Sequence, residues 1–299
     1  MHRHLIAFGA ALAAVAFVMP PAGASQESDW SDPVNIGAMI NTAYEDAGPA
    51  ISKDGRALYF QSNRPGGIGT NNCDIWVAQR ESVQQEWDWP VNLGPVVNTE
   101  TCENSVSLSR DEHHLFFTRV PGDIWVSYRR DVRDHFAWEP PVRLGESINT
   151  DTASESTARH FSSAKHGISQ LYFFSNRPGG PGNADIYVAD AFGTARLVPE
   201  LSSPEIDGGA VLSRNGLEVF FHSTRPGTGL RDLWTSTRNS VFDAWSSPVN
   251  MGAGVNSTAE DLFPALSSDD DTLFFVSTRP GGFGFGDIYV TMRTRHGDH

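Results

Sequence analysis

Carboxylates that recur at one position of a repeated unit are the residues of this sequence best suited to chemistry. In four units an acid lies six residues before the serine that precedes a turn, and in a further unit Glu155 stands one place out of register. Two or three carboxylates that face one cavity can hydrolyse a glycosidic bond, and carboxylate oxygens also suit Ca²⁺ or Mg²⁺. The candidate ligand-binding acids are Asp46, Glu103, Glu155, Asp207 and Asp261.

A second set of charged residues recurs with glycine-rich loops such as SNRPGG (62–67). The arginines of these loops are Arg64, Arg119, Arg177, Arg225 and Arg279. The aspartates that end the loops are Asp74, Asp123, Asp185, Asp232 and Asp287. Five like charges around one channel need compensation, and arginines at the same end are the obvious partners for the acids. A feature present in every repeat is also more typical of a scaffold than of a site, so we expect a structural loop network.

The third unit departs most from the repeat and is therefore a better candidate for a specific site. Its segment SESTARHFSSAKHGISQ (154–169) replaces small residues and the short turn with Arg159, His160, a longer loop and His166. His160 could act as an acid or base near Glu155, with Arg159 holding an anion; the alternative is that His160 is a packed polar residue. The short loop around Gly122 is expected to leave a notch beside these residues.

The elements that must position these residues are short β-strands. Each unit has a small apolar strand, a tight turn, an aromatic alternating strand such as ALYFQS (57–62), the glycine loop, a strand that begins with Asp, and a Trp-led outer strand such as WPVNLG (89–94). The loop arginines recur every 48 to 58 residues. Periods near this length with Gly/Pro turns in each unit indicate a β-propeller with one four-stranded blade per unit.

The count of units predicts an all-β, five-bladed propeller whose ring is closed by its N-terminal strand. The chain has an outer-strand motif at 30–37 but no outer strand after Arg293, so the first should complete the last blade and remove an exposed sheet edge. One domain is expected over residues 25–299. Its blades are placed at about 43–94, 99–145, 150–201, 202–252 and 257–293 plus 30–37, with ARLVPEL (195–201) as a degenerate outer strand.

The repeat, Ser-x-Asp-Gly-x-x-Leu-Tyr-Phe-x-Ser followed by a glycine loop and Asp-Ile-Trp/Tyr-Val, resembles the WD-like propeller repeats of the TolB family of periplasmic proteins. The resemblance covers nearly all of residues 25–299. It implies a propeller in the cell envelope. The separate N-terminal domain of TolB has no expected counterpart here, so a role in the Tol envelope machinery does not carry over.

The N-terminal segment predicts export. Arg3 and His4 precede an apolar run from Leu5 to Val18, and an Ala-Gly-Ala pattern ends at Ala24, as in a secretory signal of residues 1–24. We therefore expect a periplasmic or secreted protein that does not insert in the membrane after cleavage. Cys73 and Cys102 fall on the same face of adjacent blades, so a disulfide is expected, closing a loop of about 30 residues and contributing about 3–4 kcal/mol.

The net charge of the chain indicates which classes of partner it can bind. The full chain carries a formal charge of −14, and removal of Arg3 with the signal gives −15, which argues against nucleic acid and anionic membranes as partners. We expect a monomer. No complete nucleophile–base set, zinc motif or phosphate loop is present, so no cofactor is expected beyond a Ca²⁺ or Mg²⁺ ion at the channel mouth. Two functions remain: a module that binds a protein, peptide or glycan on the loop face, or a carbohydrate hydrolase or lyase using the channel-mouth carboxylates.

Overall fold

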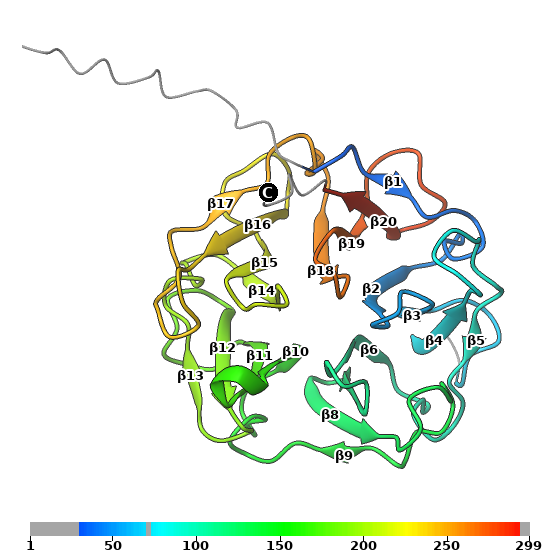
Figure 1. Cartoon of the computed structure of the whole chain (residues 1–299), viewed down its shortest axis with the longest axis horizontal. Helices are drawn as coiled ribbons and strands as arrows, with labels where there is room; N and C mark the ends of the chain where they lie inside the picture. Colours follow the sequence, from blue (N-terminus) through cyan, green and yellow to red (C-terminus); the bar gives the residue numbers. More distant parts are fainter. Residues whose placement is uncertain (1–29, 70–72, 294–299) are drawn as a thin grey trace, which may run out of the picture.

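The computed structural model describes residues 30–69 and 73–293, and these form five four-stranded antiparallel sheets arranged as a ring (Figure 1). The predicted five-bladed propeller is confirmed. The secretory signal predicted for 1–24 lies outside the described residues. Within the described residues, no helix is long and apolar enough to cross a membrane.

Each blade runs outward from an inner strand at the central axis. The first three blades comprise β2 (Asp46–Ile51), β3 (Ala57–Ser62), β4 (Asp74–Gln79) and β5 (Val91–Asn92); β6 (Glu103–Leu108), β7 (His114–Arg119), β8 (Asp123–Tyr128) and β9 (Val142–Arg143); and β10 (Glu155–Ser163), β11 (Ile168–Ser175), β12 (Asp185–Asp190) and β13 (Ala195–Leu197). The other two comprise β14 (Asp207–Leu212), β15 (Glu218–Ser223), β16 (Asp232–Thr237) and β17 (Val249–Asn250); and β18 (Asp261–Leu266), β19 (Thr272–Ser277), β20 (Asp287–Met292) and β1 (Val34–Asn35).

The fifth blade is closed by the start of the described chain, as the sequence predicts. Val34 pairs with Val290 in an antiparallel ladder, and an isolated bridge joins Trp30 to Arg293. The degenerate outer strand of the third blade is also confirmed, because β13 pairs with β12. The outer edge of β20 is thereby covered, because β1 pairs with it.

Each inner strand contains a β-bulge that the sequence pattern does not predict. The register shifts in each of them, and the bulged residues have positive φ: Gly48, Ser105, Thr157, Gly209 and Phe263. A glycine is needed at 209 for a further reason, because a Cβ there would lie 2.7 Å from Nδ1 of His222. The bulges turn the inner strands so that a second-strand side chain can reach the next blade.

An arginine–tryptophan pair fixes the outer part of four blades. Arg80 lies over the ring of Trp87 with its guanidinium carbon 4.1 Å from the ring centre, and it donates to the carbonyl of Gly55 in the hairpin turn. The same pairs are Arg129–Trp138, Arg238–Trp245 and Arg293–Trp30. Trp89 precedes the first outer strand as predicted but is 71% exposed, and the buried partner of Arg80 is Trp87.

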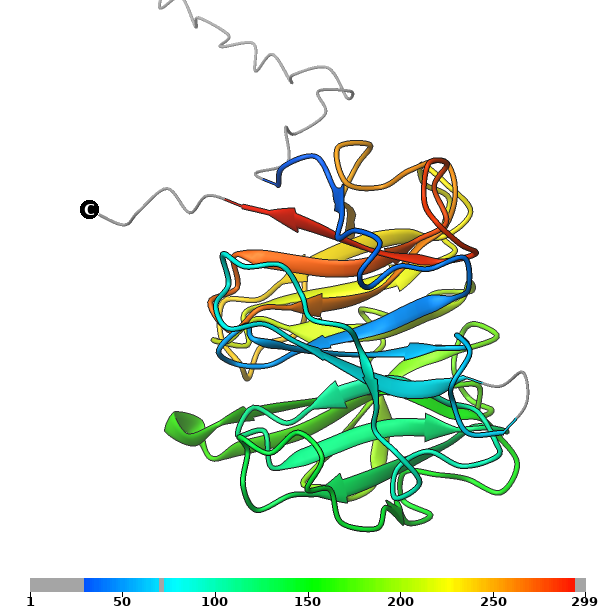
Figure 2. The same cartoon turned by 90° about the vertical axis from the view of Figure 1, so that its right-hand side faces the viewer.

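The propeller has two faces. The loop face carries the glycine loops and the links between blades; the hairpin face carries the turns between the first and second strands. In blade 3 the hairpin turn contains the 3₁₀ turn η1 (Ala164–His166), which projects from that face (Figure 2). The predicted Cys73–Cys102 disulfide is confirmed on the loop face, where it ties the first glycine loop to the link that enters blade 2.

Candidate functional site

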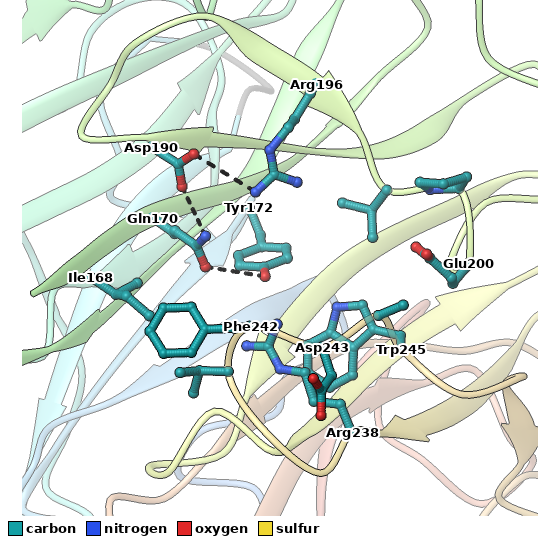
Figure 3. Close-up of a pocket in the computed structure, with 14 residues that line it drawn as sticks. Ile168, Gln170, Tyr172, Asp190, Arg196, Glu200, Arg238, Phe242, Asp243 and Trp245 are labelled. Carbon is teal, nitrogen blue, oxygen red and sulfur yellow. Dashed lines mark hydrogen bonds and ion pairs between the residues drawn. The ribbon is translucent and has the colours of Figure 1, made fainter. Parts of the chain in front are cut away.

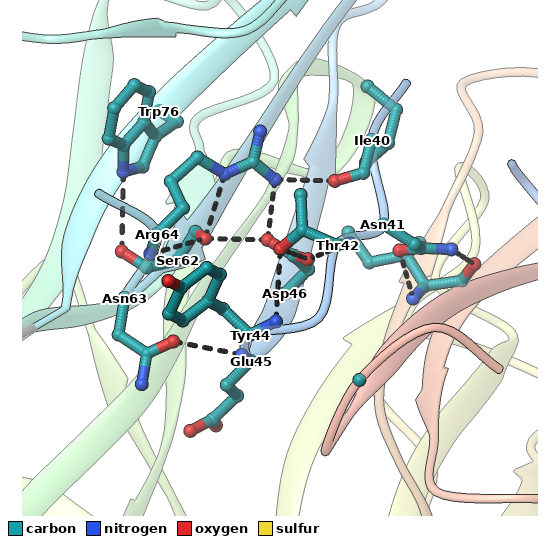
Figure 4. A network of polar contacts seen from close by, with 12 residues as sticks. Ile40, Asn41, Thr42, Tyr44, Glu45, Asp46, Ser62, Asn63, Arg64 and Trp76 are labelled. Atoms are coloured by element: carbon teal, nitrogen blue, oxygen red, sulfur yellow. Dashed lines mark hydrogen bonds and ion pairs between the residues drawn. The ribbon is translucent and has the colours of Figure 1, made fainter. Parts of the chain in front are cut away.

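The predicted ring of acids lies on the loop side of the inner strands, and Asp46 shows its geometry (Figure 4). Asp46 is fully buried, and one carboxylate oxygen lies 2.5 Å from a guanidinium nitrogen of Arg64 and 2.6 Å from the hydroxyl of Ser62. The other oxygen accepts from the backbone N–H of Thr42 at 2.6 Å and from its hydroxyl at 2.8 Å. Arg64 also donates to the carbonyl of Ile40. Every strong acceptor site of this carboxylate is therefore used inside its own blade.

The other four acids are held in a similar way, with two differences. Arg119 itself stands opposite Glu103, where the other blades have a serine, and Oδ1 of Asp207 accepts no hydrogen bond from the described residues. Each acid is fully buried and paired with the arginine of its own blade, at 2.8, 3.2, 3.4 and 2.7 Å for Glu103–Arg119, Glu155–Arg177, Asp207–Arg225 and Asp261–Arg279. Glu155 stands in register after all, because it pairs with Ser175 as Asp46 does with Ser62. Within residues 30–69 and 73–293, no group of three or more His, Cys, Asp or Glu is placed to hold a metal ion.

The aspartates that end the glycine loops form a separate set of contacts, so the predicted loop network divides in two. Asp287 accepts from the backbone N–H groups of Phe283 and Gly284 and from the side-chain amide of Asn35 at 3.0 Å. A Cβ at Gly282 would collide with this carboxylate, which explains the second glycine of the loop. Asp74 and Asp232 repeat the pattern. Asp123, in the shortened loop, is instead held by the guanidinium of Arg143 at 2.8 and 2.9 Å.

The residues that make the third blade unusual are not brought together with Glu155. Glu155 begins β10, and His160 lies about 16 Å further along that strand, at about 3.3 Å per residue. The expected acid–base pairing of the two is therefore wrong. The ring of His160 packs in a cluster with Phe116 and Phe192, with ring centres 5.9 and 6.3 Å away, and its Nε2 lies 3.0 Å from the hydroxyl of Ser169. Burial holds the pKa of His160 below its usual value, as expected for a packed histidine.

Arg159 is buried between inner strands, with 6% of its surface exposed. Its Nη1 donates to the carbonyl of Val106 in blade 2 at 3.0 Å, while Nη2 is buried and has no hydrogen-bond partner among the described residues. Burial lowers its pKa to about 10, so the side chain stays cationic at neutral pH. The carbonyl contact fixes the guanidinium, and anion binding by Arg159 stays a prediction.

The notch expected beside the shortened loop of blade 2 is also wrong. Ser154 of the next blade fills the space over Gly122, so closely that a Cβ at Gly122 would collide with it. The hydroxyl of Ser154 donates to the carbonyl of Pro121 at 2.9 Å. The short loop is therefore matched by a side chain of its neighbour and opens no space on the loop face.

The cavities near the axis lie on the hairpin face instead. The channel mouth there has a volume of about 210 Å³, and a broader depression of about 870 Å³ adjoins it and shares Lys53, Arg110, Ser162, Arg214 and Asp270 with it. Lys165 of η1 lines the outer wall of the depression. We call the two cavities together the hairpin-face pocket.

The hairpin-face pocket gathers cations on an acidic protein. Lys53, Arg110, Lys165 and Arg214 are exposed, and none of them forms an ion pair with any residue of 30–69 or 73–293. The carboxylates in the lining are Asp111, Glu112 and Asp270. Two of these accept backbone N–H groups at the rim, Glu112 from Lys53 at 2.8 Å and Asp270 from Arg214 at 2.7 Å.

Contacts between neighbouring hairpin turns make the rim of this pocket rigid. Arg110 of blade 2 reaches the carbonyls of Ser162 in blade 3 and Arg214 in blade 4, at 3.0 and 3.1 Å. The hydroxyl of Ser268 in blade 5 donates to the carbonyl of Lys53 in blade 1 at 2.6 Å. Sequence reasoning missed this face. The available signal was the longer third hairpin with His166, which was noted without being assigned to this face.

Comparison with known proteins supports the fold. No protein-family model and no curated protein matches the chain. Among solved structures, the catalytic domain of a GH62 α-L-arabinofuranosidase from Coprinopsis cinerea aligns with a TM-score of 0.60 at 11% identity, covering 89% of this chain and 98% of that one. An α-L-arabinofuranosidase from Podospora anserina, solved with cellotriose, aligns with a TM-score of 0.58 at 10% identity over 91% and 99%. A putative TolB from Agrobacterium tumefaciens aligns with a TM-score of 0.50 at 17% identity over 90% and 86%.

At these identities the similarity shows the fold alone. The structural neighbours include glycoside hydrolases and also a putative TolB, the family that the repeat motif resembles. A propeller is a scaffold for many functions, so the choice between binding and catalysis must come from the residues of this chain.

Proposed function

We propose that this protein is an exported, non-catalytic binding module that holds an anionic glycan in the hairpin-face pocket. The observation that carries the proposal is the contrast between the two ends of the inner strands. On the loop side every candidate acid is buried and paired, whereas on the hairpin side four exposed cations without ion-pair partners among the described residues surround a depression of about 870 Å³. A pocket of this size suits a short oligosaccharide.

The chemistry of the pocket favours carboxylate or sulfate groups as the recognised feature. Arg214 offers a planar guanidinium that can bind an oxyanion through two hydrogen bonds, and Lys53 and Lys165 add mobile ammonium groups. The rim is held by hydrogen bonds between blades, so little ordering is required of the backbone when a ligand binds. We therefore expect binding that weakens as salt concentration rises, because exposed charges are screened.

A glycan is preferred to an acidic peptide as the first ligand class to test. The Podospora neighbour is an α-L-arabinofuranosidase whose structure holds cellotriose, and the depression is lined by polar Asn and Ser groups as well as by its cations. The alternative function, a hydrolase or lyase using Asp46, Glu103, Glu155, Asp207 or Asp261, has less support. A glycosidase acid or nucleophile must reach the substrate, and these carboxylates are buried against arginines.

The test is titration calorimetry of the exported protein with an alginate tetrasaccharide, a heparin tetrasaccharide and tetraglutamate, run beside a hydrolysis assay on the two glycans. We expect a glycan to bind at low salt and Arg214→Gln and Lys165→Gln each to weaken it severalfold. Arg133→Gln removes the same charge from an exposed site elsewhere and should have no effect.

Three results would overturn the proposal: no binding by either glycan, equal affinity in all variants, or cleavage of a glycan. Tighter binding of tetraglutamate than of both glycans would replace the glycan with an acidic peptide as the ligand.

A further inference from the structure

A second cavity lies at the side of the ring, between blades 3 and 4. It has a volume of about 490 Å³ and runs between the outer strand of blade 3 and the connector that follows β16 (Figure 3). We call it the blade 3–4 groove and define it by Gln170, Asp190, Arg196, Arg238, Phe242 and Trp245.

The repeat explains why this groove is open. Between blades 1 and 2, His135 fills the corresponding place: its ring packs on Tyr59 with ring centres 5.8 Å apart, and its Nδ1 lies 2.7 Å from the tyrosine hydroxyl. Phe242 stands at the matching position, three residues before the buried tryptophan, but it is turned outward and is 73% exposed. The connector in blade 3 is also short, since only residues 191–194 separate β12 from β13.

One wall of the groove is a fixed relay of hydrogen bonds, visible in Figure 3. The hydroxyl of Tyr172 donates to Oε1 of Gln170 at 3.3 Å, and Nε2 of Gln170 donates to Oδ1 of Asp190 at 2.8 Å. Burial raises the pKa of Tyr172, which keeps its hydroxyl protonated. Asp190 in turn lies 3.7 Å from the guanidinium of Arg196, and both side chains are more than half exposed. The wall therefore presents an acceptor and a donor, side by side, to solvent.

The opposite wall and the floor are aromatic. Phe242 exposes its ring at the rim, and its edge contact with His166 holds it at a ring-centre distance of 5.7 Å. Arg238 lies flat on Trp245 at 4.0 Å from the ring centre, and its Nη2 is buried with no hydrogen-bond partner among the described residues. The guanidinium of Arg238 also interacts with the hydroxyl of Tyr172 on the other wall.

We propose that the blade 3–4 groove binds one ring of a neutral sugar. Sugar hydroxyls donate and accept hydrogen bonds, so one hydroxyl pair can bridge Asp190 and Arg196. The apolar face of a pyranose can pack on the exposed ring of Phe242. The groove is lined by three carboxylates and two guanidinium groups, so it offers no excess positive charge for an anion. In this it differs from the hairpin-face pocket.

The test uses nuclear magnetic resonance and calorimetric titration of the exported protein with cellotriose, xylotriose, maltotriose and chitotriose. At least one should bind saturably, and Phe242→Ala and Asp190→Asn should each weaken it about tenfold, the effect of losing about 1.4 kcal/mol. Matched controls are Phe136→Ala, an exposed phenylalanine in the blade 2 connector, and Asp131→Asn, an exposed acid paired with Arg133. Both controls should bind as the unmodified protein does.

The inference is overturned if none of the four trisaccharides binds with a Kd below about 10 mM, or if Phe242→Ala and Asp190→Asn bind them as tightly as the controls. The outcome is separable from that of the hairpin-face pocket, because Asp190 does not line that pocket. Asp190→Asn should therefore leave the binding of anionic tetrasaccharides unchanged.

Discussion

Replacement of His222 by glutamine should remove part of the acid sensitivity of the fold. His222 is 3% exposed on β15, and its Nδ1 accepts the backbone N–H of Phe263 in the next blade at 3.3 Å. The repeat itself supplies the replacement: Gln61 holds the equivalent place in blade 1 and accepts the N–H of Ser105 at 2.8 Å. Glutamine can thus make the same contact without a titratable group.

The size of the effect follows from the pKa of His222. Burial, together with the positive charges of Arg231 and Arg159, lowers this pKa to about 3. Protonation would turn the accepting nitrogen into a donor that faces another N–H. In the unfolded chain a histidine takes up a proton near pH 6.5, so acidification below that value favours unfolding. The free energy of unfolding therefore falls by about 1.4 kcal/mol per pH unit, or by about 2 kcal/mol at pH 5. This fall continues down to the pKa of His222 in the folded protein.

The assay is urea denaturation of the unmodified protein and His222→Gln at pH 7.5, 6.5, 5.5 and 5.0. The difference in unfolding free energy between the two proteins should move by about 2 kcal/mol in favour of the variant between pH 7.5 and pH 5. The contributions of all other titratable groups cancel in this difference, because both proteins retain those groups. Parallel stability curves across this range would refute the assignment of His222 as a buried neutral base.

Three further predictions concern the scaffold. Removal of residues 30–38 should lower the melting temperature of the whole ring and expose the edge of β20; unchanged melting would contradict closure by β1. Arg279→Ala leaves the buried carboxylate of Asp261 without its partner and should cost about 3–5 kcal/mol in urea denaturation, and a cost below about 1 kcal/mol would mean that the pair is not structural. The double variant Cys73→Ser/Cys102→Ser should lose about 3 kcal/mol relative to the oxidised protein, measured with thiol titration as the check on oxidation state.

Much of the fold could be predicted because each level of the sequence agrees with the next. The aromatic second strands, the Asp-led third strands and the unpaired outer strand at 30–37 all indicate the same ring. The bulge of the inner strands was not foreseen, because Ser105, Thr157 and Phe263 adopt positive φ without being glycines. The buried role of Trp87 was also missed. Both Trp87 and Trp89 precede the strand, and only their packing in the folded protein distinguishes them.

The candidate site was harder to predict. Sequence spacing correctly grouped the five acids and the five arginines, but it could not show that each carboxylate is fully buried and paired with the arginine of its own blade. It also placed His160 near Glu155, although the two residues lie five positions apart on the same extended strand, β10. Cations of the hairpin-face pocket come from turns of different blades, such as Lys53, Arg110 and Arg214, and residues so distant in sequence carry no common motif.

Hydrogen–deuterium exchange with the tightest-binding tetrasaccharide tests the central claim most directly, because it reports which face the ligand covers. The account predicts slower exchange in the hairpin turns at 109–114, 162–168 and 213–217 when ligand is added, with no change in the links at 42–46 and 97–103. Protection confined to those links, with the hairpin turns unaffected, would place the ligand on the loop face and contradict the account.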